Sequence, residues 1–473
     1  MSTPQTDAPS FSSLPLSPAM QATLQSLGYL SMTPIQASSL PLTLAGHDLI
    51  AQAKTGSGKT AAFAIPLLHK LDVRNPAVQA TALCPTRELA DQVCPEIRRL
   101  ARSEANIKVL TLCGGSTMRP QIESLAYGAH IVVGTPGRIM DHLERGTLDL
   151  RSLNTLVLDE ADRMLDMGFH DSMIYVARQC PKDRQTMLFS ATYPDTIAKL
   201  SAQFLRQPKE VKVAATHEAS KIRQRWHQVD RETRLDAVTK LLLHYRPAST
   251  IAFCNTKQQC RDLVDVLTAH GIEAIALHGD LEQRDRDQVL IQFANRSASV
   301  LVATDVAARG LDIANLEAVI NVDVTPDPEV HIHRIGRTGR GDAEGWALNL
   351  ASMSEMGRVG NLELLQKRES EWHKLEELTP ASDEPLLPPM VTIQLLGGRK
   401  EKLRPGDLLG ALTGECGFVG SQIGKINVTD FHTYVAVDRD IADQVVTQLN
   451  RVPVKGKKTK ARLLKDVQRQ ERD

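Results

Sequence analysis

The chain lacks any long apolar run. None of its hydrophobic stretches approaches the roughly 18 residues of a membrane-spanning helix, so we expect no contact with a membrane. The opening segment, "MSTPQTDAPSFSSLPLSP", is polar and broken by prolines, and it has no basic stretch followed by an apolar one, which argues against a secretory signal. These absences predict a cytoplasmic protein.

The chain also lacks paired cysteines. No two of its seven cysteines have the C-x-x-C spacing of many zinc sites, and in 473 residues this indicates reduced thiols rather than a disulfide or zinc framework. With 42% hydrophobic and 24% charged residues, the composition is neither disordered nor fibrous. The length suits about three domains.

Two blocks of the sequence share one pattern. In 11–206 and again in 221–373, short apolar runs such as "TLVLDEA" and "SVLVATD" are closed by small or polar residues and separated by amphipathic segments. This alternation predicts two α/β domains, each with a buried parallel sheet. We expect residues 1–10 to be disordered and 207–220, which has weak periodicity, to connect the two domains.

A third block follows a change of composition. The segment 374–389 is rich in proline and acidic residues and suits an extended linker. Residues 390–465 then predict the order βαββαβ, a split unit that RNA-recognition domains share with many others, and 466–473 form a charged tail. From 390 to 473 there are 15 Lys and Arg against 10 Asp and Glu. This basic end suggests a polyanionic partner, although a solubilising tail has the same composition.

The stretch "AQAKTGSGKT" at 51–60 nearly matches the phosphate-binding loop G-x-x-x-x-G-K-[ST], with Ala53 in place of the first glycine. A predicted strand precedes it and a predicted helix follows, so backbone N–H groups would face a phosphate. Lys59 would reach the β- and γ-phosphates, and the Thr60 hydroxyl would bind Mg²⁺. Ala53 costs little if its φ is negative. The alternative is an ordinary glycine-rich turn with an exposed lysine.

A second element of a nucleotide site is "TLVLDEADRML". Its apolar residues predict a buried strand that delivers Asp159 to the edge of the sheet. Asp159 would hold Mg²⁺ through water, and Glu160 would polarise an attacking water as the general base. Together, the loop and the carboxylates predict a site for ATP and Mg²⁺.

These stretches resemble the DEAD-box family of RNA helicases, and the resemblance covers both α/β blocks. It rests on the ordered motifs "GYLSMTPIQ", "AKTGSGKT", "PTREL", "GG", "TPGR", "DEAD", "SAT", "FCNT", "QRDR", "VATDVAARGLD" and "HRIGRTGR". In this family, alanine normally occupies the position of Ala53. The resemblance implies two tandem RecA-like parallel-sheet domains and RNA-dependent hydrolysis of ATP.

The resemblance also assigns roles residue by residue. Gln36 would read the adenine edge, Phe11 would stack on the base, and Asp312 would contact the ribose. The ATP-binding residues that it implies are Phe11, Gln36, Ala53, Thr55, Gly56, Ser57, Gly58, Lys59, Thr60 and Asp312, with Thr60 and Asp159 as the Mg²⁺ ligands. The catalytic residues that it implies are Lys59, Asp159, Glu160, Arg337 and Arg340. Ser190 and Thr192 would couple hydrolysis to strand separation.

An ATP site on one domain lacks positive charge for the transition state unless another element supplies it. Arg337 and Arg340 could act as arginine fingers from the second domain, which would make hydrolysis depend on closure. RNA would be held through its phosphates, and the motif matches suggest Arg87, Gly115, Thr135, Arg138, Thr256, Thr304 and Arg309. Arg87 and Arg138 could instead be structural ion-pair partners. Contacts to 2′-hydroxyls would favour RNA over DNA.

The third block has few aromatic residues where an RNA-recognition sheet presents them. Thr392 occupies one such position, and "FHTYVAV" keeps only Tyr434. Yet "RPGDLLGALTGECGFVGSQIGKINVTDFHTYVAV" and "KGKKTKARLLK" closely resemble the C-terminal domain of the DbpA-like bacterial DEAD-box helicases. That resemblance implies binding to a hairpin of 23S rRNA and recruitment to maturing large (50S) ribosomal subunits. The candidate RNA contacts are Lys425, Tyr434, Lys455, Lys457, Lys458, Lys460 and Arg462.

Two other functions fit parts of this pattern. An ATP-locked RNA clamp shares all the motifs, whereas a DNA translocase is disfavoured by "GYLSMTPIQ" and "DEAD", so we expect no DNA partner. The intact "SAT", Glu160 and Arg340 favour a helicase that opens short duplexes locally. Nothing in the sequence indicates obligate assembly, so we expect a monomer.

Overall fold

The computed structural model describes residues 9–53, 56–103, 106–193, 195–213, 221–308, 316–339 and 344–464. The chain divides into two compact units, with the division after residue 216. No helix within the described ranges combines the length and the apolar character that a bilayer crossing needs.

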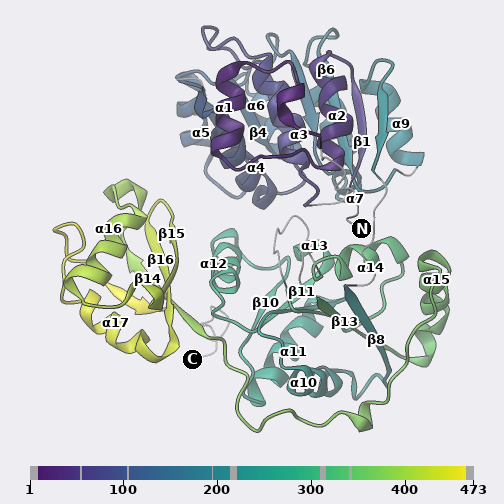
Figure 1. Ribbon diagram of the computed structural model, residues 1–473, viewed down its shortest axis with the longest axis vertical. Coiled ribbons are helices and arrows are strands. Elements are labelled where there is room, and N and C mark those ends of the chain that lie inside the picture. Colours follow the sequence, from purple (N-terminus) through teal and green to yellow (C-terminus); the bar gives the residue numbers. More distant parts are fainter. Residues whose placement is uncertain are drawn as a thin grey trace, which may run out of the picture. The chain divides into compact units, whose positions relative to one another are not determined.

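The first unit contains a parallel sheet of seven strands (Figure 1). Its strands, in spatial order, are β3 (Val109–Leu112), β4 (Ile131–Gly134), β2 (Ala80–Leu83), β5 (Thr155–Leu158), β6 (Gln185–Ser190), β1 (Leu49–Gln52) and β7 (Lys209–Lys212). Strands β2, β4, β5 and β6 are buried along their whole length. Burial of this kind is typical of a parallel sheet with helices on both faces.

Alternate residues of each strand enter two separate cores. In β5, Val157 joins one core, while Leu156 and Leu158 join the other. The first core receives side chains from α1 (Pro18–Ser26), α2 (Pro34–Leu44), α3 (Lys59–His69) and α4 (Arg87–Leu100). The second receives them from α6 (Pro136–Glu144), α7 (Ala161–Asp166), α8 (His170–Arg178) and α9 (Asp195–Phe204). The unit also contains η1 (Phe11–Ser13), η2 (Ala101–Ser103) and α5 (Met118–Ala126).

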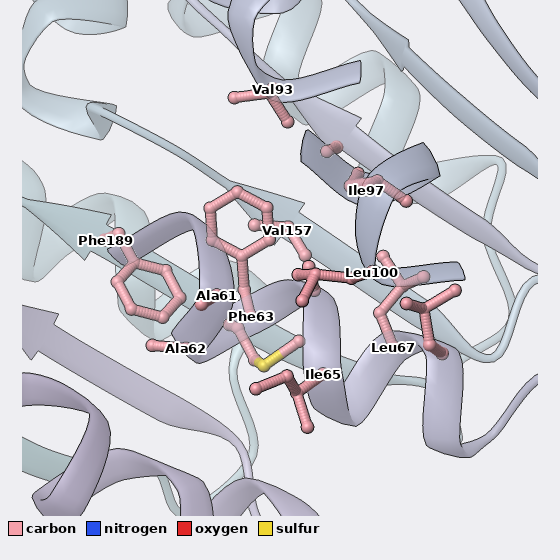
Figure 2. Close-up of a cluster of buried hydrophobic side chains, with 14 of the residues drawn as sticks. Ala61, Ala62, Phe63, Ile65, Leu67, Val93, Ile97, Leu100, Val157 and Phe189 are labelled. Carbon is pink, nitrogen blue, oxygen red and sulfur yellow. The ribbon is translucent and has the colours of Figure 1, made fainter. Parts of the chain in front are cut away.

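The helix that follows the glycine-rich loop lies in the first core. Figure 2 shows Phe63 of α3 among Phe189 of β6, Val157 of β5 and apolar side chains of α4. The rings of Phe63 and Phe189 meet edge to face, with their centroids 5.4 Å apart. Because α3 is held between the sheet and α4, its first residue, Lys59, has a fixed position.

The second unit begins with a parallel sheet of six strands. In spatial order these are β10 (Ala274–Leu277), β11 (Val300–Thr304), β9 (Thr250–Cys254), β12 (Ala318–Asn321), β13 (Gly345–Ala351) and β8 (Ile222–Gln228). Its helices are α10 (Arg234–Tyr245), α11 (Lys257–Ala269), α12 (Gln283–Ala294), α13 (Asp305–Ala308), α14 (Pro328–Ile335), η3 (Met353–Glu355), α15 (Met356–Gln366) and η4 (Leu375–Glu377). The two parallel sheets confirm the predicted pair of RecA-like domains.

The chain ends in an antiparallel sheet of four strands, in the predicted order βαββαβ. The strands, in spatial order, are β15 (Ile423–Val428), β16 (His432–Asp438), β14 (Met390–Leu396) and β17 (Ala461–Leu463). The helices are η5 (Arg399–Glu401), α16 (Pro405–Gly410), η6 (Ala411–Glu415), η7 (Gly420–Gln422), η8 (Arg439–Ile441) and α17 (Ala442–Leu449). Ile393 and Leu395 of β14 pack on these helices, while Thr392 and Gln394 point to the other face.

The described residues of both predicted linkers are structured. The segment 207–220 contains β7, which pairs in parallel with β1 so that Lys209 lies beside Leu49. The segment 374–389 lies against the second unit: Leu386 is buried in the core of its parallel sheet, and Arg246 donates to the carbonyl of Glu384 at 2.8 Å. The first sheet therefore extends past residue 206, and the proline-rich segment is extended but anchored.

Two buried histidines make the second unit sensitive to acid. His227 and His331 are 0% exposed, and the ring nitrogens of His331 have no hydrogen-bond partner in the described ranges. Burial lowers the pKa of His227 to about 4 and that of His331 to about 3. An unfolded histidine titrates near 6.5. The unfolded chain therefore binds protons first, so stability is fully present above about pH 6.5 and is lost as the pH falls towards about 4.

We expect acidification from about pH 7.5 to about pH 5 to lower the free energy of unfolding of this unit by about 2 kcal/mol for each of these histidines. Urea unfolding followed by tryptophan emission measures this, because all three tryptophans (Trp226, Trp346 and Trp372) lie in the second unit. The variant His227→Gln should lose about 2 kcal/mol less on acidification, whereas His270→Gln, at an exposed position, should behave like the wild type. An equal acid loss in His227→Gln would contradict this explanation.

Candidate active site

Three segments of the predicted site meet at one edge of the first sheet. The glycine-rich loop follows β1, Asp159 follows β5, and Ser190 ends β6. The Ala53 N–H donates to the Ser190 carbonyl at 3.0 Å, and the Asp159 N–H donates to the Leu83 carbonyl at 2.9 Å. Because the strands are parallel, their carboxyl ends gather the loop, the carboxylates and the "SAT" segment together.

The glycine-rich loop has the backbone that a phosphate-binding loop needs. Gly56 and Gly58 have φ values of 81° and 91°, a region that glycine enters without cost. Ala53 is not among the described residues with positive φ, as its tolerance there requires. A Cβ on Gly58 would lie 2.5 Å from Gln36 Nε2. Ser57 and Thr60 are partly buried in this loop and at the start of α3, and Thr55 lies outside the described residues.

Gln36 supports the loop directly. It is 2% exposed, its Nε2 donates to the Gly58 carbonyl at 3.1 Å, and its Oε1 accepts from the Thr33 N–H at 2.9 Å. A carboxamide has two donors and two acceptor positions, so each end of the Gln36 side chain retains capacity for one more bond. Its predicted contact with adenine stays a prediction.

Phe11 does not present a ring face to a ligand. It is 4% exposed and packs in the first core, where its ring meets that of Tyr29 edge to face with the centroids 6.0 Å apart. Stacking of adenine on Phe11 needs accessible ring area, which this placement does not offer. The geometry thus argues against the stacking that the sequence predicted and instead places Phe11 as support for Tyr29.

Lys59 and Asp159 are charged side chains buried at this edge. They are 6% and 3% exposed, and neither Lys59 Nζ nor Asp159 Oδ1 has a hydrogen-bond partner in the described ranges. Burial raises the pKa of Asp159 to about 6, an effect that the charge of Lys59 opposes. An unsatisfied buried charge is costly. These atoms therefore fit phosphate oxygens and Mg²⁺, which would supply the missing partners.

Glu160 has a strained backbone and a buried cationic partner. Its φ is 54°, in the left-handed region, which is uncommon for a residue with a side chain. Its Oε2 lies 3.2 Å from Nη1 of Arg163, and the two side chains are only 4% and 9% exposed. The strained turn directs the carboxylate of Glu160 to the same edge as Asp159.

The last carboxylate of "DEAD" links this turn to the "SAT" segment. Asp162 Oδ2 accepts from the N–H of Ala191 at 3.1 Å, from the N–H of Thr192 at 3.0 Å and from the Thr192 hydroxyl at 3.1 Å. Ser190, 1% exposed, has a hydroxyl without a hydrogen-bond partner in the described ranges. A displacement of the carboxylate turn would therefore be felt directly at the "SAT" segment.

The predicted RNA contacts of the first unit follow neighbouring strands of the same sheet. Arg87 begins α4 after β2, the exposed Gly115 (φ 74°) follows β3, and Thr135 and Arg138 lie at the start of α6 after β4. Arg87 Nε lies 3.4 Å from Asp91 Oδ2. Arg138 donates to Gln121 Oε1 and to the Ser116 carbonyl, both at 3.0 Å. Arg87 thus has an ion-pair partner, as the structural alternative expected, whereas the partners of Arg138 are neutral. The role of both arginines with RNA stays a prediction.

In the second unit, the predicted site residues lie at the ends of helices and strands, and a buried arginine lies among them. The Thr256 hydroxyl caps α11 by accepting from the Gln259 N–H at 3.1 Å, Thr304 ends β11, and Arg337, 7% exposed, follows α14. Within "HRIGRTGR", Arg334 is 2% exposed, and its Nε and Nη2 donate to the carboxylate of Asp305 at 2.7 and 2.6 Å. Arg309, Asp312 and Arg340 lie outside the described residues.

Tyr434 does not present an open ring on the C-terminal sheet. It is 3% exposed, its hydroxyl accepts from Gln394 Nε2 at 3.3 Å, and burial raises its pKa. Beside it, Thr392 Oγ1 accepts from Asn295 Nδ2 at 3.2 Å and lies 2.7 Å from Ser297 Oγ. Residues that follow α12 therefore cover this face. Contact of Tyr434 with RNA would require the face to be uncovered, and it stays a prediction.

The predicted cationic residues of the C-terminal domain are exposed, in contrast to Tyr434. Those on or beside the sheet are Lys425, Lys455, Lys457, Lys458, Lys460 and Arg462. Lys455 Nζ is already engaged, because it donates to the Lys402 carbonyl at 2.8 Å and pairs with Asp407 at 3.0 Å. Arg462 Nε donates to Gln394 Oε1 at 2.9 Å.

Comparison with known proteins agrees with this architecture. The profile of the DEAD/DEAH box helicases matches residues 33–200, that of the helicase conserved C-terminal domain matches 233–342, and that of the DbpA RNA binding domain matches 392–463. The ATP-dependent RNA helicase DbpA of Escherichia coli K12 is 49% identical over 452 residues, which are 95% of this chain and 98% of that protein. The chain belongs to the DEAD-box ATP-dependent RNA helicases of the DbpA type.

Other relatives of this helicase share its two core domains. The DEAD-box ATP-dependent RNA helicase CshA of Geobacillus kaustophilus is 42% identical over 371 residues, 78% of each chain. A solved structure of Saccharomyces cerevisiae Dbp5 bound to RNA and ADP BeF3 has a TM-score of 0.71 and 31% identity, covering 78% of this chain and 97% of that one. Mss116p bound to ssRNA and AMP-PNP has a TM-score of 0.69 and 27% identity, covering 79% and 80%.

Sequence reasoning missed three residues that organise the helicase site. Asp162 binds the "SAT" segment, Arg163 pairs with Glu160, and Arg334 pairs with Asp305. Asp162 and Arg163 stand in "DEADR", and Arg334 stands in "HRIGR". The spacing of three residues between Glu160 and Arg163 at the start of one helix is the signal that could have identified Arg163. The contacts of Asp162 with Thr192 and of Arg334 with Asp305 join segments that are distant in sequence, so no local pattern predicts them.

The buried Arg163–Glu160 pair predicts a large effect on stability. Arg163→Met leaves the Glu160 charge buried beside an apolar side chain, so the free energy of unfolding of the first unit should fall by about 3 kcal/mol or more. Introduced into Glu160→Gln, the same change should cost much less, because no charge is stranded. Denaturant unfolding followed by circular dichroism measures both steps.

The matched control for this pair is Arg145→Met. Arg145 pairs with Asp141 at 2.6 Å on α6, but these side chains are 58% and 38% exposed, so its loss should cost under about 1 kcal/mol. Equal costs for Arg163→Met with and without Glu160→Gln would show that the pair is not what stabilises the turn.

Proposed function

We propose that this helicase opens short RNA duplexes in the 23S rRNA of maturing large ribosomal subunits, with its C-terminal domain as the targeting element. The observation that carries the proposal is the match of 392–463 to the DbpA RNA binding domain. The exposed lysines around β17 support it, because they suit phosphate contacts. In this proposal the protein acts as a cytoplasmic monomer on RNA.

ATP binding is assigned to the loop and carboxylates of the first unit. Lys59 holds the β- and γ-phosphates, and the Thr60 hydroxyl and Asp159 hold Mg²⁺, which when bound neutralises phosphate charge. Mg²⁺ usually keeps several waters and takes only one or two carboxylates, which suits a site with Asp159 as its carboxylate. The buried, unpartnered Lys59 Nζ and Asp159 Oδ1 support this assignment.

Glu160 is assigned as the general base that orients and polarises the attacking water. Arg337 and Arg340 supply positive charge from the second core domain when ATP and RNA together bring the two domains to closure. ATP drives this closure only through better contacts with the closed state. The closed state holds one RNA strand by its phosphates and excludes the partner strand, so the duplex opens locally. The bonds of Asp162 to Ala191 and Thr192 support coupling through the "SAT" segment.

The assignment of Glu160 predicts a separation of binding from turnover. Glu160→Gln keeps the size and the backbone of the site but removes the base, so ATP and RNA should still bind while turnover falls by about 10²-fold or more. Fluorescent-nucleotide titration and steady-state ATPase assays measure the two quantities. Unchanged turnover in Glu160→Gln would remove Glu160 from this role.

The targeting role predicts a dependence on RNA identity. ATPase rates would be measured with a homopolymer, with total ribosomal RNA and with a short 23S fragment bearing the expected hairpin, for the full chain and for a chain without 390–473. Only the ribosomal RNAs should stimulate the full chain strongly, and the deletion should abolish this preference. Equal stimulation by every RNA in both chains would leave an RNA-dependent ATPase and refute the ribosomal role.

A further inference from the structure

An exposed aromatic ring lies at one end of the C-terminal sheet. Phe431, in the turn between β15 and β16, is 55% exposed. Lys400 Nζ lies 4.1 Å from the centre of its ring. Because the ammonium group covers one face of the ring, the exposed area belongs mainly to the other face and the edge. An aromatic side chain this open and flanked by a cation is a favourable surface for a nucleic-acid base.

The backbone around Phe431 is fixed by the neighbouring loop. The N–H groups of Gly397, Arg399 and Lys400 donate to the carbonyls of Phe431, Thr429 and Asp430 at 2.9, 2.8 and 3.1 Å. A Cβ on Gly398 would lie 2.3 Å from the Thr429 carbonyl oxygen, so only glycine allows this close approach. The ring and Lys400 are therefore presented by a rigid pair of loops.

Other cations lie next to this pair. The Lys460 carbonyl accepts from the Leu396 N–H at 3.0 Å, which places Lys460 beside the strand that leads to the 397–400 loop. Lys457 closes a turn with Val454, and Lys455 in this turn donates to the Lys402 carbonyl at 2.8 Å, which places the turn beside η5. The Glu401 carboxylate accepts from the Gly398 N–H at 2.7 Å, which directs it to the backbone. We call Lys400, Phe431, Lys457 and Lys460 the hairpin-end surface.

The usual binding face of such a sheet is not free. Thr392, Gln394 and Tyr434 are 1%, 2% and 3% exposed, and residues that follow α12 bond to Thr392. An RNA-recognition sheet normally stacks bases on aromatic residues of that face. Here the exposed aromatic ring of the domain lies at the end of the hairpin, together with the cations.

We propose that the hairpin-end surface binds unpaired RNA, with one base stacked on Phe431 and the flanking phosphates held by Lys400, Lys457 and Lys460. RNA is favoured over a protein ligand because the domain matches an RNA-binding family and because the ammonium group of Lys400 lies against the ring. This inference rests on the proposed function only in assuming that the domain binds RNA. It does not depend on 23S rRNA being the target. The site takes single-stranded segments, such as the loop of a hairpin, because bases in a duplex are not free to stack on a side chain.

Four variants of the full chain test this site. Phe431→Ala removes the ring, Phe431→Tyr restores it, and Lys400→Gln removes one charge. Val419→Ala is the control, because Val419 is 62% exposed in the same domain but precedes β15, whereas Phe431 follows it. The probes are a short 23S hairpin fragment and an unrelated hairpin of equal length, each end-labelled for fluorescence anisotropy over a range of salt concentrations.

Phe431→Ala should weaken binding of RNA by between about fivefold and a hundredfold, with an unchanged salt dependence. Phe431→Tyr and Val419→Ala should bind like the wild type. Lys400→Gln should reduce the slope of log affinity against log salt by about one, as expected for the loss of one phosphate contact. In Phe431→Trp, RNA should quench emission beyond the change that the native tryptophans give in the wild type.

The proposal would be overturned if Phe431→Ala bound both hairpins with the affinity of the wild type, or if RNA did not quench the emission of the tryptophan in Phe431→Trp. The ring would then be left as a surface for a protein. The proposed function fails separately. If the wild type binds both hairpins equally but Phe431→Ala weakens both, the ribosomal targeting is refuted and the hairpin-end surface stands.

Discussion

The burial of Lys59 and Asp159 without hydrogen-bond partners in the described residues is the constraint on which the active site depends. Each of these charges is costly to bury alone, so the surrounding structure must hold them in place. The parallel sheet does so, because α3 is packed on it through Phe63 and Asp159 is the residue at which β5 ends. The raised pKa of Asp159 records the same cost. In the proposed function, nucleotide phosphates and Mg²⁺ would remove that cost, and binding energy would thereby be directed to the point where chemistry occurs.

The second feature of the site is that its carboxylates belong to one strained turn. Glu160 adopts positive φ and pairs with Arg163, while Asp162, two residues on, holds Ala191 and Thr192. A short helix that begins in a strained turn cannot shift one carboxylate without shifting the other. Glu160 and the carboxylate that holds the "SAT" segment are thus linked by a few covalent bonds. If Glu160 is the general base, as proposed, coupling between hydrolysis and RNA would be a local event rather than a long pathway.

Much of this arrangement could be predicted from sequence, because it depends on local patterns. Buried strands that end in small or charged residues predict which side chains meet at a sheet edge, and this placed Lys59 and Asp159 together. Ser190 was assigned through the family resemblance. Contacts between distant segments could not be predicted, such as Asp162 with Thr192. The strand β7 was missed because only Val211 among its four residues is buried, so an edge strand reads as a polar linker. The burial of Phe11 could not be predicted either, because a motif position does not reveal whether a ring faces a ligand or the core.

The C-terminal domain shows most clearly where sequence patterns reach their limit. Its strand order follows from alternating apolar residues, yet the same alternation cannot tell which partner the polar face meets. Thr392, Gln394 and Tyr434 would suit either RNA or protein, and the structure uses them for protein contacts. Each buried hydrogen bond of this kind adds little to the stability of the contact, but a polar group left there without a partner would be costly. A sheet face used in this way leaves recognition to the loops at the sheet's ends, where length and composition are less constrained by packing and where charge can accumulate.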